Sequence, residues 1–576
     1  MATEISLDDL IGNAYFQTHF HVTAVREVMA ETDEKIPLSG VREADGGSRY
    51  VSFEKKRAAR VTKVLVITLI ILALVLTAVA VPVALLASSS STSPDKLANS
   101  VEVKNIMAHL QALNDIANNN TNSPVPSRSV LNQYNASAEY VISVLKSVGY
   151  TPYTQSFQVP VNMEYGGSFS IQTSGIPPYV RTFVQKFDFD VMRYSGNGNA
   201  QGSLKALSQD ASGCNSADYS GVNLGDIVLI QYNSNCTYYD KAKLASENNA
   251  SAIIFYWNEQ NAGLLPSRSR VLGTNLTDFI DLPILSATYG LGRELLNLIS
   301  TATVVATIET QTSVTIAWTY NVFADTAEGR DDRIVVFGSH LDSVAEGPGI
   351  NDNGSGSATN LEVAVQVANQ KWKPINKVRF AWWGGEELGL LGSKYYVNTL
   401  TEEGKSNHSL NLNFDMLASP NFIRQVYTIN GSSFAGSDEF VCACYRVQEL
   451  FEDRFRQKDA LYQTGPFGGG SDYVHFMDTN IPAGALATGA GSLKTVEERE
   501  LFGGFPNAAL DTCYHQSCDT VSNIDQTVLG QMADAAAYTL QQVMMMDDLH
   551  AFLCNATTEI ASYSELSAND NECSQA

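Results

Sequence analysis

The sequence predicts an α/β fold: a mostly parallel mixed sheet covered by helices on both faces, with a β-rich insert and an N-terminal transmembrane helix. Three observations predict it. From residue 314 onward, short apolar runs alternate with segments of helical periodicity, which is typical of parallel strands between helices. Residues 157–313 instead carry short β-like runs separated by Gly and Pro. Residues 64–87 form one long apolar stretch.

The apolar stretch at residues 64–87 contains no charged side chain. As a helix it would span roughly 36 Å at about 1.5 Å per residue, enough to cross a bilayer. Five basic residues lie just before it: Lys55, Lys56, Arg57, Arg60 and Lys63. By the positive-inside rule we expect a single-pass type II membrane protein, with residues 1–63 in the cytosol and those after 87 in a lumen or outside the cell. The alternative is cleavage near Ala87 and Ser88.

Glycosylation sequons and cysteines agree with that topology. No sequon precedes the apolar stretch, and nine follow it, at Asn119, Asn135, Asn235, Asn249, Asn275, Asn353, Asn407, Asn430 and Asn555. The sequon at Asn353 is expected to stay unglycosylated, because a glycan there would stand beside Asp352. All eight cysteines also follow it, an even number in a compartment that permits disulfides. Plausible pairs are Cys214–Cys236, Cys513–Cys518 and Cys554–Cys573. Cys442 and Cys444 stand too close together for a comfortable bridge and stay unassigned.

The chain divides into five expected segments. Residues 1–63 form a cytosolic tail, residues 64–87 the signal anchor and residues 88–96 a Ser-rich stalk. Residues 97–156 and 314–560 form one domain, here called the main domain, and residues 157–313 are the insert. The formal net charge is −24, from 37 Lys and Arg against 61 Asp and Glu, which argues against a nucleic-acid partner. A surface of that sign favours solubility and attracts cationic peptides.

The insert contains the run "GDIVLIQYNSNCTYYDKAKLASENNASAIIFYW" at residues 225–257. The run predicts a strand, a loop with a cysteine, a helix and a second strand. It resembles a protease-associated domain, and the resemblance implies a lid or recognition module that carries no chemistry. The alternative is an unrelated small β-rich insert.

Imidazoles and carboxylates follow the predicted strands of the main domain, where α/β sheets bind ligands. They are His340 and Asp342, Asp352 in the next loop, Glu386 and Glu387, Asp415, and finally His515. Because these loops lack cysteine ligands, they suit an ion such as Zn²⁺ bound by nitrogen and oxygen. Two histidines and three of these carboxylates already exceed the need of one catalytic zinc. They suit two ions about 3.5–4 Å apart that one carboxylate can bridge.

One histidine competes with His515 for a place in this site. His475 lies three residues after Asp472 on a predicted helix, and we expect it to pack or to form part of the site wall. His515 stands between Cys513 and Cys518 in a short loop, and a disulfide there would fix its ring. The other histidines are expected to lie on the surface, in packing positions or in the cytosolic tail.

Six motifs occur in one order along the main domain: "HLDS", "GINDNGSG", "WWGGEELGLLGS", "FDM", "SDYVHF" and "CYHQSCDT". Together they resemble the zinc aminopeptidases with a co-catalytic metal pair, peptidase family M28, of the aminopeptidase Y type. The resemblance covers roughly 97–155 and 314–548, and it implies the zinc exopeptidase fold. The insert falls where the larger members of the family carry a protease-associated domain. The family includes vacuolar and secreted enzymes, which fits a vacuolar or lysosomal lumen or the cell exterior.

The resemblance implies a role for each motif residue. His340 and Asp415 would hold one Zn²⁺, Glu387 and His515 a second, and Asp352 would bridge both together with a hydroxide. Asp342 would orient the His340 imidazole through its carboxylate, Glu386 would be the general base, and Tyr514 would stabilise the oxyanion. The substrates would be the N-termini of peptides or proteins. The order of the two glutamates rests on the family match alone.

Three other functions remain as alternatives on the same fold. They are a carboxypeptidase, a glutaminyl cyclase with one zinc, and an inactive receptor-type ectodomain. All five ligand positions and the base are present, which disfavours the last two. About 28 residues follow the last predicted helix, less than the dimerisation domain of the carboxypeptidases.

The chain also carries Tyr473 where relatives often have His. The preferred N-terminal residue and the oligomeric state are not predicted.

Overall fold

The computed structural model describes residues 93–119, 125–174, 178–208, 211–264, 266, 269–273 and 277–554. All of them belong to one compact unit, Thr92–Ala576. The predicted tail, the predicted anchor at 64–87 and most of the stalk lie outside the described residues, as does Cys573. From residue 93 to residue 554, no described helix is both long and apolar enough to span a bilayer.

A single 14-stranded sheet runs through the main domain and the insert. In the main domain its neighbouring strands are, in order, β13 (Gln463–Pro466), β12 (Gln425–Thr428), β14 (Ala483–Ala487), β11 (His408–Phe414), β9 (Arg330–His340), β10 (Asn376–Trp383) and β8 (Val304–Asp325). The four strands β14, β11, β9 and β10 are parallel to one another, while β12 and β8 join them antiparallel. This confirms the predicted mixed, mostly parallel sheet.

Helices cover both faces of this sheet, as the pattern predicted. On β9, Val335 and Phe337 join one core cluster, and Ile334 and Val336, which alternate with them, join another. The first cluster packs under α3 (Val103–Asn118), α4 (Tyr134–Ser147), α7 (Gly356–Asn369), α10 (Asp438–Gln457), α13 (Gln526–Met544) and α14 (Leu549–Cys554). The second lies against α8 (Leu391–Thr399) and α11 (Val474–Met477). Short helices α9 (Glu402–Ser406) and α12 (Val496–Phe502) complete the main domain.

Local sequence explains where several helices begin. The side chains of Ser437 and Asp525 accept hydrogen bonds from the first-turn N–H groups of α10 and α13, and Thr237 does the same for α5 (Tyr238–Glu247). After α4, Gly149 adopts a φ of 100°, a backbone conformation that glycine tolerates best. These caps fix the residues at which the helices begin, and the glycine marks where α4 ends.

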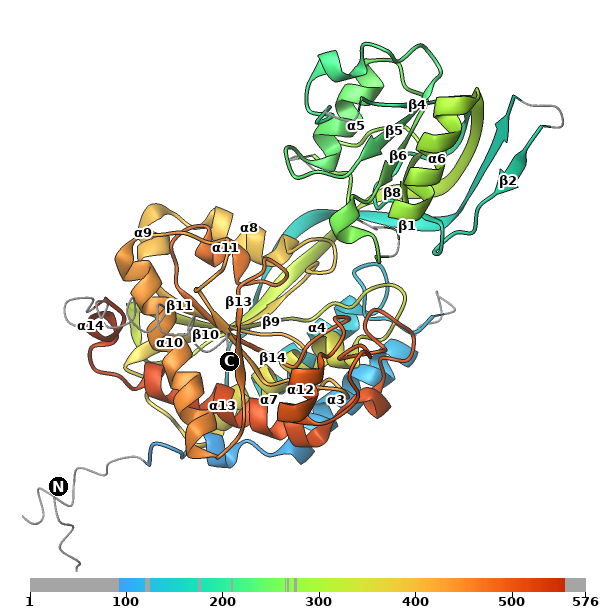
Figure 1. Ribbon diagram of the computed structural model, residues 1–576. Helices are drawn as coiled ribbons and strands as arrows, with labels where there is room; N and C mark the ends of the chain where they lie inside the picture. Colours follow the sequence, from blue (N-terminus) through green and yellow to red (C-terminus); the bar gives the residue numbers. More distant parts are fainter. Residues whose placement is uncertain are drawn as a thin grey trace, which may run out of the picture. The chain divides into compact units, whose positions relative to one another are not determined.

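Two long antiparallel strands connect the main domain to the insert. They are β1 (Tyr153–Thr173) and β8, and Figure 1 shows them leading from the lower body to the green upper one. Both run without a break through residues 156–157 and 313–314, the predicted limits of the insert. Because the same strands belong to both parts, the insert is built onto an extension of the main sheet.

The insert has its own layered arrangement. Its strands continue from β8 in the order β4 (Gly198–Ala206), β5 (Ile227–Gln231), β6 (Ala252–Tyr256), β7 (Ile284–Ala287) and β3 (Phe189–Val191), and β2 (Val180–Thr182) pairs with β1. The four strands β4 to β7 are parallel. Helices α5 and α6 (Tyr289–Thr301) flank them, and a disulfide joins Cys214 to Cys236 as predicted. The predicted strand, loop, helix and strand at 225–257 are confirmed.

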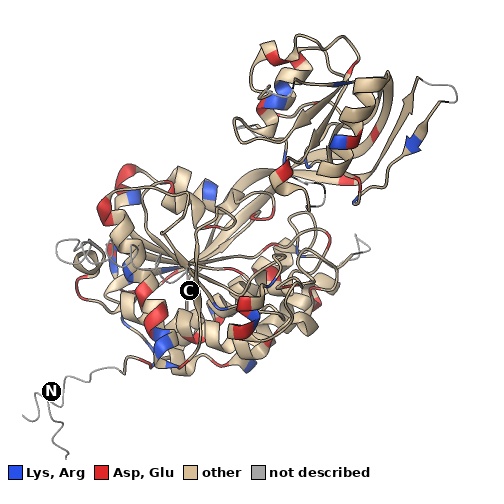
Figure 2. Ribbon diagram, in the orientation of Figure 1, with Lys and Arg blue, Asp and Glu red and all other residues tan. Residues whose placement is uncertain are grey.

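Charged side chains of both signs alternate along the surface helices. Figure 2 shows red and blue positions side by side on α10, where Arg456 pairs with Glu452 and Asp453. Helix α10 thus carries mixed charge and lacks a continuous basic face of the kind that binds a phosphate backbone. The expectation that nucleic acid is not a partner is not tested by this helix and stays a prediction.

Candidate metal centre

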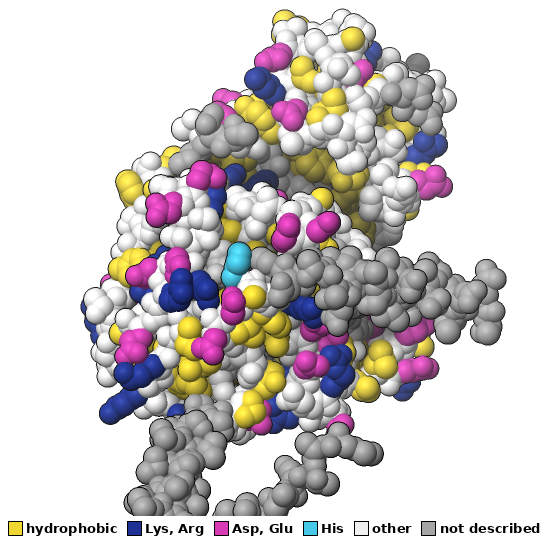
Figure 3. Space-filling view, turned by 90° about the vertical axis from the view of Figure 1, so that its left-hand side faces the viewer, with side chains coloured by type: hydrophobic (Ala, Val, Ile, Leu, Met, Phe, Trp, Pro, Cys, Tyr) yellow, Lys and Arg dark blue, Asp and Glu magenta, His cyan; other side chains and the backbone are white. Residues whose placement is uncertain are grey.

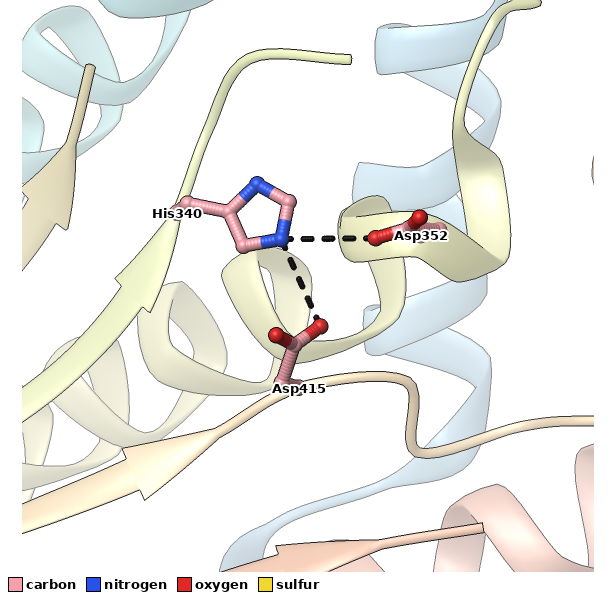
Figure 4. A group of neighbouring side chains, drawn as sticks. All are labelled: His340, Asp352 and Asp415. Carbon is pink, nitrogen blue, oxygen red and sulfur yellow. Dashed lines mark ion pairs between the residues drawn. The ribbon is translucent and has the colours of Figure 1, made fainter. Parts of the chain in front are cut away.

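The first group of the candidate site lies at the ends of two neighbouring parallel strands. His340 is the last residue of β9 and Asp415 directly follows β11, so the pairing of these strands brings both to the same edge. Asp352 approaches from the short, irregular helical segment Ile350–Ser355 that leads into α7. The His340 Nε2 atom lies 3.3 Å from Asp352 Oδ1 and 3.4 Å from Asp415 Oδ1 (Figure 4). The three side chains therefore converge on one point.

The second group shares Asp352 with the first. His515 Nε2 lies 3.1 Å from Asp352 Oδ2 and 3.2 Å from Glu387 Oε2. In each group, the potential ligand atoms lie within 4.8 Å of one another. Asp352 thus presents Oδ1 to one imidazole and Oδ2 to the other, which is the arrangement needed by a carboxylate that bridges two ions.

The charge balance of the site is that of a cation-binding centre. Burial disfavours a charged His515, but the carboxylates of Glu387 and Asp352 outweigh it and raise its pKa to about 11. His340 is affected in the same way by Asp415 and Glu386, and its pKa lies well above the usual value. Without a metal, the two imidazoles thus take up protons to neutralise the carboxylates, a role that divalent cations would fill.

Individual atoms also fit bound metal ions. The buried oxygens Glu387 Oε1 and Asp415 Oδ1 have no hydrogen-bond partner in the described structure. His340 Nδ1 lies 3.1 Å from the main-chain carbonyl of Asp342. Since a carbonyl can only accept, Nδ1 carries the proton, and the Nε2 lone pair is left for a metal. The nitrogen and oxygen donors, free of cysteine, suit Zn²⁺.

Asp342 is placed differently from the expectation. Its carboxylate Oδ1 is 3.9 Å from His340 Nδ1, and the carbonyl of the same residue makes the closer contact. The carboxylate is instead engaged by three consecutive N–H groups: Oδ1 accepts from Gly385 and Glu386 at 2.9 and 3.1 Å, and Oδ2 accepts from Glu387 at 3.3 Å. Asp342 therefore holds the turn that carries both glutamates. Burial raises its pKa to about 6.

The backbone of Asp352 is fixed by a residue that sequence reasoning missed. The Asp519 carboxylate accepts from the N–H groups of Asn351 and Asp352 at 2.8 and 3.0 Å. Asn523 and Asp511 extend this buried network. Asp519 lies far along the chain, in the motif that also contains His515, and that proximity was the one signal that could have pointed to it.

A buried arginine, also missed, lies beneath the site. Arg128 is fully buried and donates to the carbonyls of Leu341, Pro348 and Gly349, the last two in the loop before Asp352. Burial lowers its pKa to about 10, although Asp342 and three other carboxylates oppose that shift. Its partners are main-chain atoms more than 200 residues away, so no sequence pattern marks it.

The loop that carries His515 is closed by the predicted disulfide between Cys513 and Cys518. Within it, the Tyr514 ring stacks on the His515 ring with centroids 3.8 Å apart. Burial, reinforced by the carboxylates of the site, raises the pKa of Tyr514 far above its usual value, so its hydroxyl keeps its proton. It is therefore available as a hydrogen-bond donor.

The remaining motif residues lie around the site. His475 is outside both groups and faces Asp478, with Nδ1 3.7 Å from that carboxylate. Tyr473 is buried, and its hydroxyl accepts from the N–H groups of residues 468–470 at 3.2–3.4 Å. Asn353 is fully buried and donates to the carbonyl of Phe414, so its sequon is closed to a glycan. Cys442 and Cys444 are buried free thiols.

The two groups open into a cavity of about 860 Å³, of a size that holds a small ligand. The main domain contributes the candidate ligands, Glu386, Tyr514 and apolar side chains such as Met416 and Tyr427. The insert contributes Asn162, Lys186, Arg193 and Arg270 to the lining of the same cavity. The expected role of the insert as a lid or recognition module stays a prediction.

Two family models match the chain. The model described as peptidase family M28 matches residues 321–540, and the PA domain model matches residues 200–295. An aminopeptidase of Pseudomonas aeruginosa (strain UCBPP-PA14) is 35% identical over 458 residues, which are 78% of this chain and 82% of the relative. A probable leucine aminopeptidase 2 of Aspergillus fumigatus is 37% identical over 363 residues, 62% of this chain and 69% of that protein.

Among solved structures, the chain resembles BSAP, a zinc aminopeptidase from Bacillus subtilis. The TM-score is 0.51 at 22% identity, over 78% of this chain and 96% of the other. At that identity the likeness supports the fold alone.

Proposed function

The chain is an aminopeptidase of peptidase family M28 with an inserted PA domain, and we propose that it removes N-terminal residues from peptides with the help of two Zn²⁺ ions. The main support for this proposal is the position of Asp352, whose two carboxylate oxygens face two separate imidazoles. We assign His340 and Asp415 to one ion, Glu387 and His515 to the other, and Asp352 to both. Zinc is also the metal named for the structural relative from Bacillus subtilis.

Bound zinc would polarise the scissile carbonyl and lower the pKa of a shared water molecule towards about 7. Glu386 takes the proton from the attacking water and then gives it to the leaving amine. Its carboxylate is buried beside the ligands, which makes it a stronger base than an exposed glutamate. The Tyr514 hydroxyl donates a hydrogen bond to the oxyanion that forms. The carboxylates of the site attract the free α-ammonium of the substrate, which favours cleavage at the N-terminus.

The apolar side of the cavity supports a substrate preference. Met416 follows Asp415 in the chain, and it lines the cavity together with Tyr427 and Ala487. We propose that this wall receives an apolar N-terminal side chain. The name of the Aspergillus relative, leucine aminopeptidase, supports the same preference.

The test of the proposed function is zinc content together with hydrolysis of aminoacyl-p-nitroanilides. We expect close to two zinc ions per chain and faster hydrolysis of the leucine substrate than of the glutamate or lysine substrate. The N-acetylated leucine substrate should not be cleaved, because it lacks the free ammonium. A folded protein without zinc and without turnover would contradict the proposal.

We also propose that residues 64–87 anchor the chain in a membrane and that the enzyme domain lies in a vacuolar or lysosomal lumen or outside the cell. Sequon asparagines 119, 135, 235, 249 and 430 are exposed, and the disulfides at Cys214–Cys236 and Cys513–Cys518 suit an oxidising compartment. Cells expressing the full chain should yield a membrane-bound glycoprotein whose apparent mass on gel electrophoresis falls after glycosidase treatment. A soluble product without glycans would overturn this topology.

A further inference from the structure

The turn at residues 385–389 carries the two glutamates and is hydrogen-bonded from two sides. Its N–H groups at 385, 386 and 387 donate to Asp342, as described above. Its first two carbonyls accept from nearby N–H groups of the same segment: Gly385 accepts from Leu391, the first residue of α8, at 3.1 Å, and Glu386 accepts from Gly389 at 2.7 Å. The next three carbonyls, of residues 387, 388 and 389, point towards the insert.

Two arginines of the insert donate to these three carbonyls. Arg193 Nη1 donates to the Glu387 carbonyl at 3.1 Å. Arg270 Nη1 donates to the carbonyls of Leu388 and Gly389, each at 3.2 Å. The polar backbone groups of the turn are therefore shared between Asp342 of the main domain and the arginines of the insert.

The contact with Arg270 needs a glycine in the turn. Gly389 has a φ of 111°, and a Cβ at this residue would coincide with the Arg270 guanidinium. The space that receives the arginine therefore exists because residue 389 has no side chain.

The two arginines are fixed to each other and to the core of the insert. Val271 N–H donates to the Arg193 carbonyl at 2.8 Å, which pairs the two segments. Met192 and Val271, each next to one of the arginines in sequence, are fully buried in one core cluster of the insert. Figure 3 shows a face that is hollowed where the insert meets the main domain, with basic side chains visible in the hollow. The main chain at both arginines is thus anchored to the core of the insert, which supports a positioning role even though the Arg270 side chain is exposed.

We infer that Arg193 and Arg270 are positioning residues, through which the insert holds the Glu386–Glu387 turn in its working geometry. The inference rests on the proposed roles of Glu386 as base and Glu387 as zinc ligand. It assigns the insert a task beyond covering the site. A shift of about 1 Å in a catalytic group can cost up to 100-fold in rate, so loss of these hydrogen bonds should lower turnover more than substrate binding.

The test compares Arg193→Ala, Arg270→Ala and the double variant with Arg181→Ala in the full-length protein. Arg181 pairs with Glu294 inside the insert at 2.6 Å, so it is a matched control that does not touch the turn. We expect kcat of the double variant to fall about tenfold or more with KM within about twofold, and zinc to be lost faster to a chelator. Arg193→Lys should retain most of the turnover, because one ammonium donor can serve the single Glu387 carbonyl.

The inference would be overturned if the double variant kept both its kcat and its zinc. A lower melting temperature would not rescue the inference, because the hydrogen bonds of Arg193 and Arg270 would then contribute to stability only. The outcome can be separated from a failure of the proposed function. Wild-type protein without zinc or turnover contradicts the proposed function, whereas active wild-type protein with an equally active double variant contradicts this inference alone.

Discussion

The two halves of the continuous sheet share one architecture and differ in the residues that follow their strands. In the main domain, the parallel strands β9, β10 and β11 lead to His340, Glu386 with Glu387, and Asp415. In the insert, the parallel strands β5, β6 and β7 lead to Tyr232, Trp257 and Thr288. Both halves are flanked by helices. The candidate chemistry therefore depends on the residues at the strand ends, and the architecture alone does not supply it.

The strand ends of the insert are satisfied by packing and main-chain hydrogen bonds. The Tyr232 and Trp257 rings meet at 5.1 Å, and the N–H groups of Trp257 and Thr288 donate to main-chain carbonyls. In the main domain, the buried oxygens Glu387 Oε1 and Asp415 Oδ1 at the corresponding edge have no hydrogen-bond partner among the described residues. A protein interior tolerates such oxygens poorly unless a cation binds them. The strand ends of the insert therefore contribute to stability, whereas those of the main domain are suited to a bound cation.

The largest effect is expected when one buried aspartate of each half is replaced by asparagine. Asp352→Asn should release zinc from both groups and lower kcat/KM by about 1000-fold or more, because the shared carboxylate loses its charge. Asp226→Asn in the insert changes a buried aspartate that accepts from Asn223 N–H at 2.8 Å. It should lower the melting temperature and leave zinc content unchanged. Zinc content and kcat/KM are measured for both variants. Equal losses of zinc and of kcat/KM in the two variants would contradict the assignment of the metal centre to the main domain alone.

The second prediction separates the two adjacent glutamates. Glu386→Gln should retain both zinc ions and lower kcat by about 10²–10⁴-fold, the usual contribution of a general base. Glu387→Gln should lose zinc, because its carboxylate lies 3.2 Å from the His515 Nε2 atom. Zinc content and kcat are measured for both variants. Metal loss in Glu386→Gln with metal retention in Glu387→Gln would show that the two roles are reversed.

The third prediction concerns pH. In the metal-free protein the pKa of His515 is raised to about 11, so its imidazole is protonated at neutral pH and must lose that proton to bind zinc. Zinc affinity should therefore rise with pH below that value, by about tenfold per pH unit for each proton released. Calorimetric titration of the metal-free protein in buffers of different protonation enthalpy measures the release. Affinity independent of pH, with no proton released, would contradict it.

The smallest effect on activity is expected for a buried charge of the insert. Lys241 is 1% exposed, and its Nζ donates to the Asn233 carbonyl at 2.7 Å. Lys241→Met should lower the free energy of unfolding by about 1–3 kcal/mol, because this carbonyl loses its donor, while kcat stays within about twofold. Thermal unfolding and steady-state kinetics test it. A large loss of turnover would mean that the insert takes part in the chemistry.

The sequence predicted the strand ends well, because buried strands have a clear apolar pattern and the residues that follow them are easy to identify. His340, Glu386, Glu387 and Asp415 were found in this way. Asp352 lies in a loop that begins with Gly349 at a φ of 63°, and His515 itself has a φ of 57°. No periodicity marks such backbone. Asp352 and His515 could be counted among the candidate ligands from their residue types, but their individual roles depended on motif resemblance.

The supporting residues could not be predicted. Arg128, Arg193 and Arg270 act on main-chain carbonyls that lie more than 100 residues away, and a carbonyl is present at every residue. The carboxylate of Asp342 was expected on an imidazole, but it accepts from three N–H groups of the neighbouring turn. Such partners follow from the folded path of the chain and leave no trace in residue type or spacing.

The proposed bridging of two zinc ions by Asp352 can be observed by X-ray diffraction. Data would be collected from crystals of the zinc-loaded protein on both sides of the zinc absorption edge. We predict two anomalous peaks about 3.5–4 Å apart, one beside His340 and Asp415 and the other beside Glu387 and His515, with Asp352 between them. A single peak, or two peaks of which only one contacts Asp352, would contradict the account.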